Sequence, residues 1–224
     1  LRSNNITPLS GTLFFLPIIL VLFYKLESPT IIICLLFFIL GFLSDLKILN
    51  SYRLRLFFQI SFLILLFFFN KELEIYTRLK LIDSLMTSDF FRVIIGTFFF
   101  MVLINGFNLI DGTNSLCSLN FLIITIFACL IMNKMNISFI NFELSLLIIP
   151  LVIFFILNFF GLNFLGDGAA YGIGFFLGYV LVNISLIDQS ISPYYIANLL
   201  WYPAFENLFC IVRRGLKSSN NYLP

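Results

Sequence analysis

The chain has 224 residues, of which 61% are hydrophobic and 11% are charged, whereas soluble domains average roughly 45–50% apolar and about 25% charged residues. This composition excludes a water-soluble globular domain and requires a lipid bilayer as the solvent for most of the chain. A net charge of +2 provides no basic surface that could follow a nucleic-acid backbone, so nucleic acid is excluded as a partner. The chain has no histidine, so acid–base and metal chemistry within these residues must fall to carboxylates.

Eight apolar stretches, separated by polar or turn residues, predict the fold. A helix needs about 20 apolar residues to cross the hydrocarbon core, and a lipid-exposed strand would leave its backbone unpaired. We therefore predict an all-α, polytopic transmembrane helix bundle. Its predicted spans cover residues 8–24, 30–44, 54–70, 90–108, 115–133, 143–160, 169–187 and 193–212.

The connecting loops of eight spans alternate between the two sides of the membrane. The N-terminus, the loops 45–53, 109–114 and 161–168, and the C-terminal tail then share one side. The other side holds most of its basic residues in or beside one long loop, and long loops weigh less in the positive-inside rule. We predict that the first side is cytoplasmic.

The predicted cytoplasmic side carries three loop carboxylates, each at or beside a helix end. Asp45 follows the second span, Asp111 follows the fourth, and Asp167 precedes the seventh. A solvated helix end would explain any one of them. Three acids at a similar depth on one side predict a common site.

The end of the fourth span adds polar side chains to this site. Asn105, Asn108 and Asp111 have the spacing i, i+3 and i+6, which places them on one face of a helix that ends near Gly112. One interpretation is that these amides join neighbouring helices. We favour the other, a polar cleft that opens to one side of the membrane.

Glycines flank the third acid, in Gly166-Asp167-Gly168, just before a helix. They leave backbone N–H groups open to a phosphate. Together with the other two acids they predict a site for Mg²⁺, which binds carboxylate oxygens and leaves its other positions to water and substrate phosphates. Phosphoryl transfer to a lipid-borne nucleophile is the chemistry that needs this arrangement at a membrane surface.

Four ordered blocks of the sequence resemble the polyprenyl-phosphate N-acetylhexosamine-1-phosphate transferases, glycosyltransferase group 4, which include the phospho-N-acetylmuramoyl-pentapeptide transferases. The blocks are Thr7-Pro-Leu-Ser-Gly11; Gly41-Phe-Leu-Ser-Asp45-Leu with Arg53, Arg55 and Gln59; Asn105-Gly-Phe-Asn-Leu-Ile-Asp-Gly-Thr-Asn114; and Phe164-Leu-Gly-Asp-Gly-Ala-Ala-Tyr171.

The resemblance implies an enzyme of the bacterial inner membrane with its active site on the cytoplasmic face. A UDP-N-acetylamino sugar would give its sugar-1-phosphate to polyprenyl (undecaprenyl) phosphate, releasing UMP in a reaction that requires Mg²⁺. This would be the priming step of cell-wall or surface-polysaccharide synthesis. We expect one integral-membrane catalytic domain over residues 1–224, incomplete at both ends.

The resemblance also implies roles for individual residues. Asp45, Asp111 and Asp167 would be catalytic, with Asp167 and Asp45 as the metal ligands and Asp45 as the acid near the lipid phosphate. The implied substrate-binding residues are Asn105, Asn108, Gly112, Asn114, Asn158 and Phe164, of which Asn158 and Phe164 would frame the uridine.

Two departures from the family pattern keep other interpretations open. Ser44 stands where the family has the first acid of an Asp-Asp pair, and Asn114 stands where an acid is usual. One alternative is a catalytically inactive relative, which Ser44 motivates. The other is a polytopic transporter, whose acids would line an ion path near the middle of the bilayer.

Overall fold

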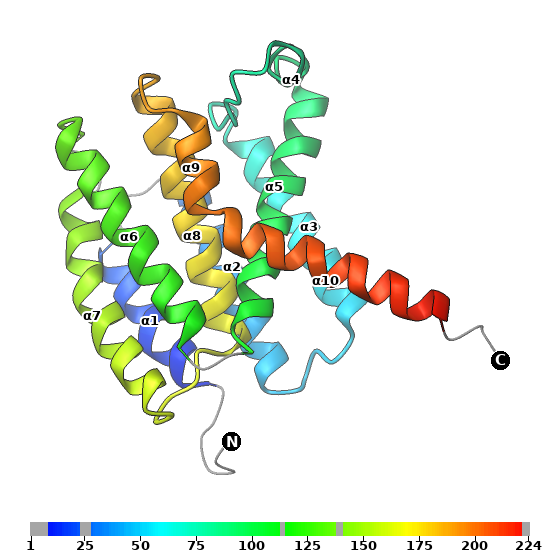
Figure 1. Ribbon diagram of the computed structural model, residues 1–224, viewed down its shortest axis with the longest axis vertical. Helices are drawn as coiled ribbons and strands as arrows, with labels where there is room; N and C mark the ends of the chain where they lie inside the picture. The colour runs from blue at the N-terminus through cyan, green and yellow to red at the C-terminus, as the bar shows by residue number, and fades with distance from the viewer. Residues whose placement is uncertain (1–8, 23–27, 113–114, 138–140, 221–224) are drawn as a thin grey trace.

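The computed structural model describes residues 9–22, 28–112, 115–137 and 141–220, which form ten α-helices and no strand (Figure 1). The helices are α1 (Ser10–Leu22), α2 (Ser28–Asp45), α3 (Tyr52–Phe69), α4 (Lys80–Met86), α5 (Asp89–Ile110), α6 (Leu116–Lys134), α7 (Asn141–Phe159), α8 (Gly166–Ile187), α9 (Pro193–Leu199) and α10 (Trp201–Asn220). Five of them, α3, α5, α6, α7 and α8, are long and apolar enough to cross a membrane, and α1 and α2 are shorter apolar helices. The prediction of an all-α, polytopic helix bundle is confirmed.

Helix α8 lies at the centre of the bundle. Helices α1, α2, α5 and α6 pack around it, and nearly all of its residues are buried. In a membrane, helix packing depends on close van der Waals contact, which small residues permit. The glycines and alanines in the first half of α8 supply this property.

Two glycines let α2 approach the beginning of α8 closely. A Cβ atom on Gly41 of α2 would collide with the backbone of Asp167 and Gly168, and a Cβ atom on Gly168 would collide with the side chain of Thr12 in α1. Helices α2 and α8 therefore meet backbone to backbone at the point where α8 begins, and the side chain of Thr12 from α1 packs against the same point. This contact fixes the C-terminal end of α2 against the N-terminal end of α8.

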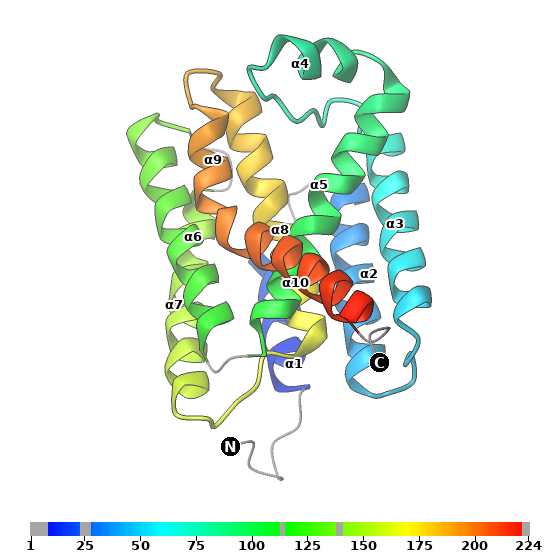
Figure 2. The same ribbon diagram turned by 45° about the vertical axis from the view of Figure 1, so that its right-hand side comes forward.

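Four helix ends come together at one end of the bundle, at the bottom of Figures 1 and 2: the ends of α2 and α5 and the beginnings of α3 and α8. These are the ends that carry the predicted acids and their neighbours. The prediction that the loops beside the second, fourth and seventh spans share one side is confirmed.

The predicted eighth span, over residues 193–212, is wrong, because two helices replace it. Helix α9 ends at Leu199, and α10 begins at Trp201 in a new direction and crosses α5 (Figure 2). Pro203 gives the physical reason. In a continuous helix its ring would clash with the carbonyl group of Leu199, whereas a proline in the first turn of a new helix is tolerated.

Candidate active site

Two acids from other helices cap the beginning of α8. The carboxylate of Asp45 accepts hydrogen bonds from the backbone N–H groups of Asp167 (3.0 Å) and Gly168 (3.2 Å), and Asp111 accepts one from Gly166 (3.2 Å). The first N–H groups of a helix have no partner within it, and the helix dipole favours negative charge there. The three predicted acids are thus brought together by the N-terminal turn of α8.

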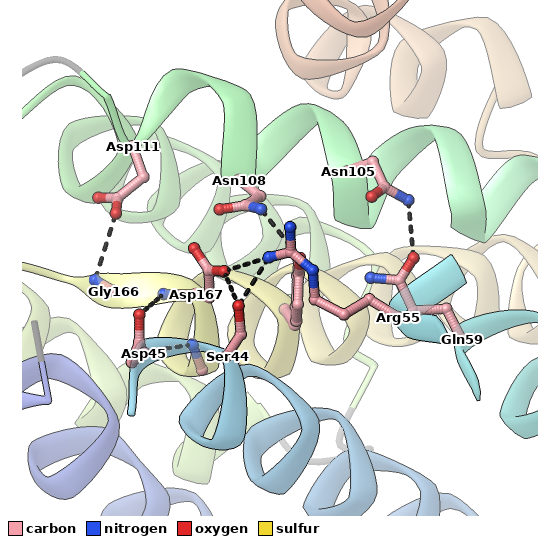
Figure 3. Close-up of polar contacts among 11 residues, drawn as sticks. Ser44, Asp45, Arg55, Gln59, Asn105, Asn108, Asp111, Gly166 and Asp167 are labelled. Carbon is pink, nitrogen blue, oxygen red and sulfur yellow. Dashed lines mark hydrogen bonds and ion pairs between the residues drawn. The ribbon is translucent and has the colours of Figure 1, made fainter. Parts of the chain in front are cut away.

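The side chain of Asp167 belongs to a network of three residues. Its Oδ2 atom accepts hydrogen bonds from the Ser44 hydroxyl (2.6 Å) and from Nη1 of Arg55 (2.8 Å), and the same Nη1 also donates to Ser44 Oγ (2.6 Å; Figure 3). The side chains of Arg55 and Asp167 are each 25% exposed, so this ion pair lies at the edge of the protein interior. Ser44 joins the two charges through one hydroxyl group.

The polar residues of α5 point to the same side of that helix, as their spacing predicted. Asn108 donates to the hydroxyl of Tyr171 (3.0 Å). Asn105 donates to Oε1 of Gln59 (3.0 Å; Figure 3). Each amide therefore joins α5 to a neighbouring helix, as one of the two interpretations expected. Both also line a cavity, as the other expected.

Sequence reasoning left Arg55, Tyr171 and Gln59 out of the predicted site. Two of them carried a usable signal, because residues four apart share one face of a helix. Tyr171 follows Asp167 by four residues in α8, and Gln59 follows Arg55 by four residues in α3. Arg55 and Gln59 both lie within the second sequence block.

The cavity has a volume of about 450 Å³ and lies between α3, α5 and α10. One part of its lining is polar, with Arg55, Asn105, Asn108 and Tyr171. The rest is mostly apolar: it contains Leu56, Phe98, Met101, Val102, Leu109 and Ile211, together with Tyr52 and Asn207. We call it the α3–α5–α10 groove. It offers polar groups to a head group and an apolar surface to a chain.

Two predicted substrate-binding residues, Asn158 and Phe164, do not line this groove and form hydrogen bonds to other segments. Asn158 is buried; its Oδ1 accepts from the N–H of Ser115 (2.7 Å), and its Nδ2 donates to the carbonyl of Asn163 (2.6 Å). The carbonyl of Phe164 accepts from the hydroxyl of Ser10 (2.8 Å). Of the remaining two, Gly112 is exposed just after α5, and Asn114 lies outside the described residues.

The described acids of the site could hold a magnesium ion through one or two carboxylates, but not through a cluster of three. Among the described residues, no three Asp, Glu, Cys or His side chains are grouped as a metal site. Both oxygens of Asp45 accept hydrogen bonds from backbone N–H groups of α8. In contrast, the carboxylate oxygen of Asp167 that does not bond to Ser44 and Arg55 is turned away from them (Figure 3). Mg²⁺ is commonly held by one or two carboxylates plus water and substrate phosphates. Asp167 fits this requirement, and both oxygens of Asp45 already hold the first turn of α8, so its predicted role as a metal ligand stays a prediction.

Comparison with known proteins identifies the family. The model of the glycosyl transferase family 4 matches residues 29–185, which contain the whole Ser44–Arg55–Asp167 network. The chain is also 33% identical over 193 residues to a phospho-N-acetylmuramoyl-pentapeptide-transferase of Dictyoglomus turgidum, a match that covers 82% of this chain and 60% of that relative. No solved structure matches the chain. The chain therefore belongs to glycosyl transferase family 4.

Proposed function

We propose that the protein transfers an N-acetylamino-sugar-1-phosphate from a UDP-sugar to polyprenyl phosphate and releases UMP, at the cytoplasmic face of a bacterial inner membrane. One observation carries the proposal: the Ser44–Arg55–Asp167 network lies beside the polar part of a groove whose remaining lining is mostly apolar. A lipid phosphate has the matching shape, with a charged head and a hydrocarbon chain. Membership of glycosyl transferase family 4 supports the same reaction class.

The proposed reaction exchanges one phosphoanhydride bond for another. An oxygen of the polyprenyl phosphate attacks the phosphorus that carries the sugar, a new P–O–P bond forms, and the bond to UMP breaks. A phosphate monoester is mostly doubly charged at neutral pH, with a second pKa of about 6. The nucleophile therefore needs orientation and charge neutralisation more than it needs a general base.

The residues of the site supply those two requirements. Arg55 can form paired hydrogen bonds to phosphate oxygens, and Asn108 and Tyr171 provide polar groups beside it in the groove. Mg²⁺ held at Asp167 would neutralise the diphosphate charge. Asp45 and Asp111 hold the first turn of α8, so they keep the backbone of Asp167 in place.

The test uses the full-length protein in membranes. Labelled sugar phosphate should pass from UDP-N-acetylglucosamine or UDP-N-acetylgalactosamine to undecaprenyl phosphate, with UMP release that depends on Mg²⁺. Asp167→Asn should lower the rate by about 100-fold or more, as expected for loss of a group that acts on developing charge. Asp188→Asn is the matched control, because Asp188 is an acid at the opposite end of α8.

The possible results separate the interpretations. An Asp167→Asn protein that works at the wild-type rate contradicts the proposal. A wild-type protein that uses no UDP-sugar donor identifies the catalytically inactive relative that Ser44 motivates. A transporter is less well supported, because Asp45, Asp111 and Asp167 lie at helix ends and bind the backbone of α8 or a neighbouring side chain.

A further inference from the structure

Arg55 brings a positive charge from one helix to an acid on another. It belongs to α3, which packs against α2 and α5, and its guanidinium group reaches Asp167 at the beginning of α8. The same nitrogen bonds to Ser44 at the end of α2. The contact is made by side chains alone, so its loss would leave the backbone hydrogen bonds of all three helices intact.

The hydrogen-bonding groups of Arg55 are incompletely used in this position. Its Nη1 serves both Ser44 and Asp167, while its Nε is buried without a hydrogen-bond partner among the described residues. A guanidinium group has five N–H donors in a planar fork that matches two oxygens of one phosphate. Arg55 also lines the α3–α5–α10 groove. A phosphate in the groove would therefore offer it a better partner than the contacts it has.

Asp167 already has a cationic partner, the guanidinium group of Arg55. Arg55 bonds to its Oδ2, and like charges close together repel. A divalent cation that binds the carboxylate must approach against the charge of Arg55. The neighbouring Ser44 is neutral, so it gives Arg55 a hydrogen-bond acceptor without the negative charge that an acid would supply at this position.

We propose that Arg55 and a divalent cation are alternative partners of Asp167, and that a phosphate monoester in the α3–α5–α10 groove draws Arg55 away from the carboxylate. Phosphate and cation then bind cooperatively, because each removes an obstacle to the other. The coupling must be reciprocal, so the cation also strengthens phosphate binding. This inference rests on the proposed function and adds to it an order of events at the site.

The experiment measures metal binding, not turnover. Full-length protein in detergent is titrated with Mn²⁺, and free Mn²⁺ is read by electron paramagnetic resonance, with no added ligand, with decyl phosphate or with UMP. The two phosphates distinguish a lipid-borne monoester from a nucleotide monoester. Asp167→Asn protein in the same micelles gives the background, because it measures Mn²⁺ held by phosphate or detergent alone.

We expect at least one phosphate to tighten Mn²⁺ binding to the wild-type protein by about tenfold, the worth of roughly one charge-assisted hydrogen bond. Arg55→Gln should bind Mn²⁺ about tenfold more tightly without phosphate, and added phosphate should then change little. Arg53→Gln is the matched control, because Arg53 lies two residues away, is exposed and bonds to Tyr52. It should behave as the wild type does.

Two results would overturn the inference: an Arg55→Gln protein with wild-type Mn²⁺ affinity, or one in which phosphate still tightens Mn²⁺ binding tenfold. If Arg55→Gln does not yield folded protein, Arg55→Lys serves instead. It keeps a cation beside Asp167 but loses the planar fork, so weak Mn²⁺ binding should persist and the phosphate effect should shrink. An unchanged phosphate effect would contradict the inference.

Coupled binding without sugar-phosphate transfer would refute the proposed function alone, and transfer without coupling would refute only the role of Arg55.

Discussion

The carboxylate of Asp45 accepts a hydrogen bond from the backbone N–H of Asp167 at 3.0 Å, so one acid of the site holds the backbone of another. A second bond, from the N–H of Gly168, uses the other oxygen of the same carboxylate. Asp45 thereby performs for α8 the function of an N-cap residue, although it comes from the end of α2. Its effect on the reaction should pass through the position of Asp167.

Asp45→Ala should destabilise the protein, because the first turn of α8 loses two hydrogen bonds. We expect a loss of about 1–2 kcal/mol, which is typical for removal of an N-cap, and a smaller loss for Asp45→Asn, which keeps one acceptor oxygen. Thermal unfolding of the protein in detergent measures both. Asp188→Ala, at the opposite end of α8, is the control, because the hydrogen bond that it removes, from the N–H of Ser190, is local. Wild-type stability of Asp45→Ala together with lost transfer would show that Asp45 acts on the substrate directly.

Ser44→Ala should slow transfer without unfolding the protein. The hydroxyl of Ser44 donates to Asp167 and accepts from Arg55, so its removal frees both charged side chains from one shared partner. We expect the rate to fall by about tenfold, the effect of losing one hydrogen bond to a charged group. UMP release from the full-length protein measures it. An unchanged rate would mean that Ser44 does not orient Asp167, and activity gained only in Ser44→Asp would identify an inactive relative.

The sequence was sufficient to predict the helical bundle and the meeting of the three acids. Both depend on local properties: the length of apolar runs, and the presence of Asp45, Asp111 and Asp167 at the ends of runs that share one side. The break at Leu200 was missed because the apolar run continues through it. Pro203 was the signal, since its ring cannot follow a helical turn that contains Leu199.

The partners of the acids could not be predicted in the same way. That Asp45 and Asp111 cap α8 depends on how closely three helix ends approach, and hydrophobic periodicity contains no such distance. Asn158 shows the same limit. The family resemblance implied that Asn158 frames the uridine, and sequence alone could not show that its amide bonds to the N–H of Ser115 and the carbonyl of Asn163.

Gly41→Ala should disturb the geometry of the site, although Gly41 has no side chain that takes part in it. Its Cβ atom would collide with the backbone of Asp167 and Gly168, which cannot move aside as a flexible side chain can. Helices α2 and α8 must then separate, at a cost of about 1–3 kcal/mol, and Asp45 moves away from its N–H donors. Thermal unfolding should show the loss.

Gly112→Ala is the control for stability, since the nearest atom to its Cβ, the carbonyl oxygen of Leu109, lies 3.5 Å away. Equal stability of the two variants would contradict the close packing of α2 on α8.

Gly106→Ala should displace α10 and thereby change the groove. A Cβ atom on Gly106 of α5 would collide with the carbonyl group of Pro203, so α10 must move away from α5. The hydrogen bond from Asn207 to the carbonyl of Val102 (3.0 Å) should then break. Because Asn207 lines the groove and Asp167 does not, we expect the KM for polyprenyl phosphate to rise more than kcat falls.

The fluorescence of the single tryptophan of the chain can be used to measure the displacement of α10. Trp201 is the first residue of α10, is exposed, and lies two residues before Pro203. In vesicles that contain brominated lipids, quenching of its fluorescence depends on its depth in the bilayer, so Gly106→Ala should change the quenching profile. Gly178→Ala is the matched control, because its Cβ would make a tight contact of 3.2 Å with the side chains of Leu103 and Phe100 in α5, and none with the backbone of α10. If Gly106→Ala left both the profile and the KM unchanged, α10 would not depend on Gly106 for its position on α5.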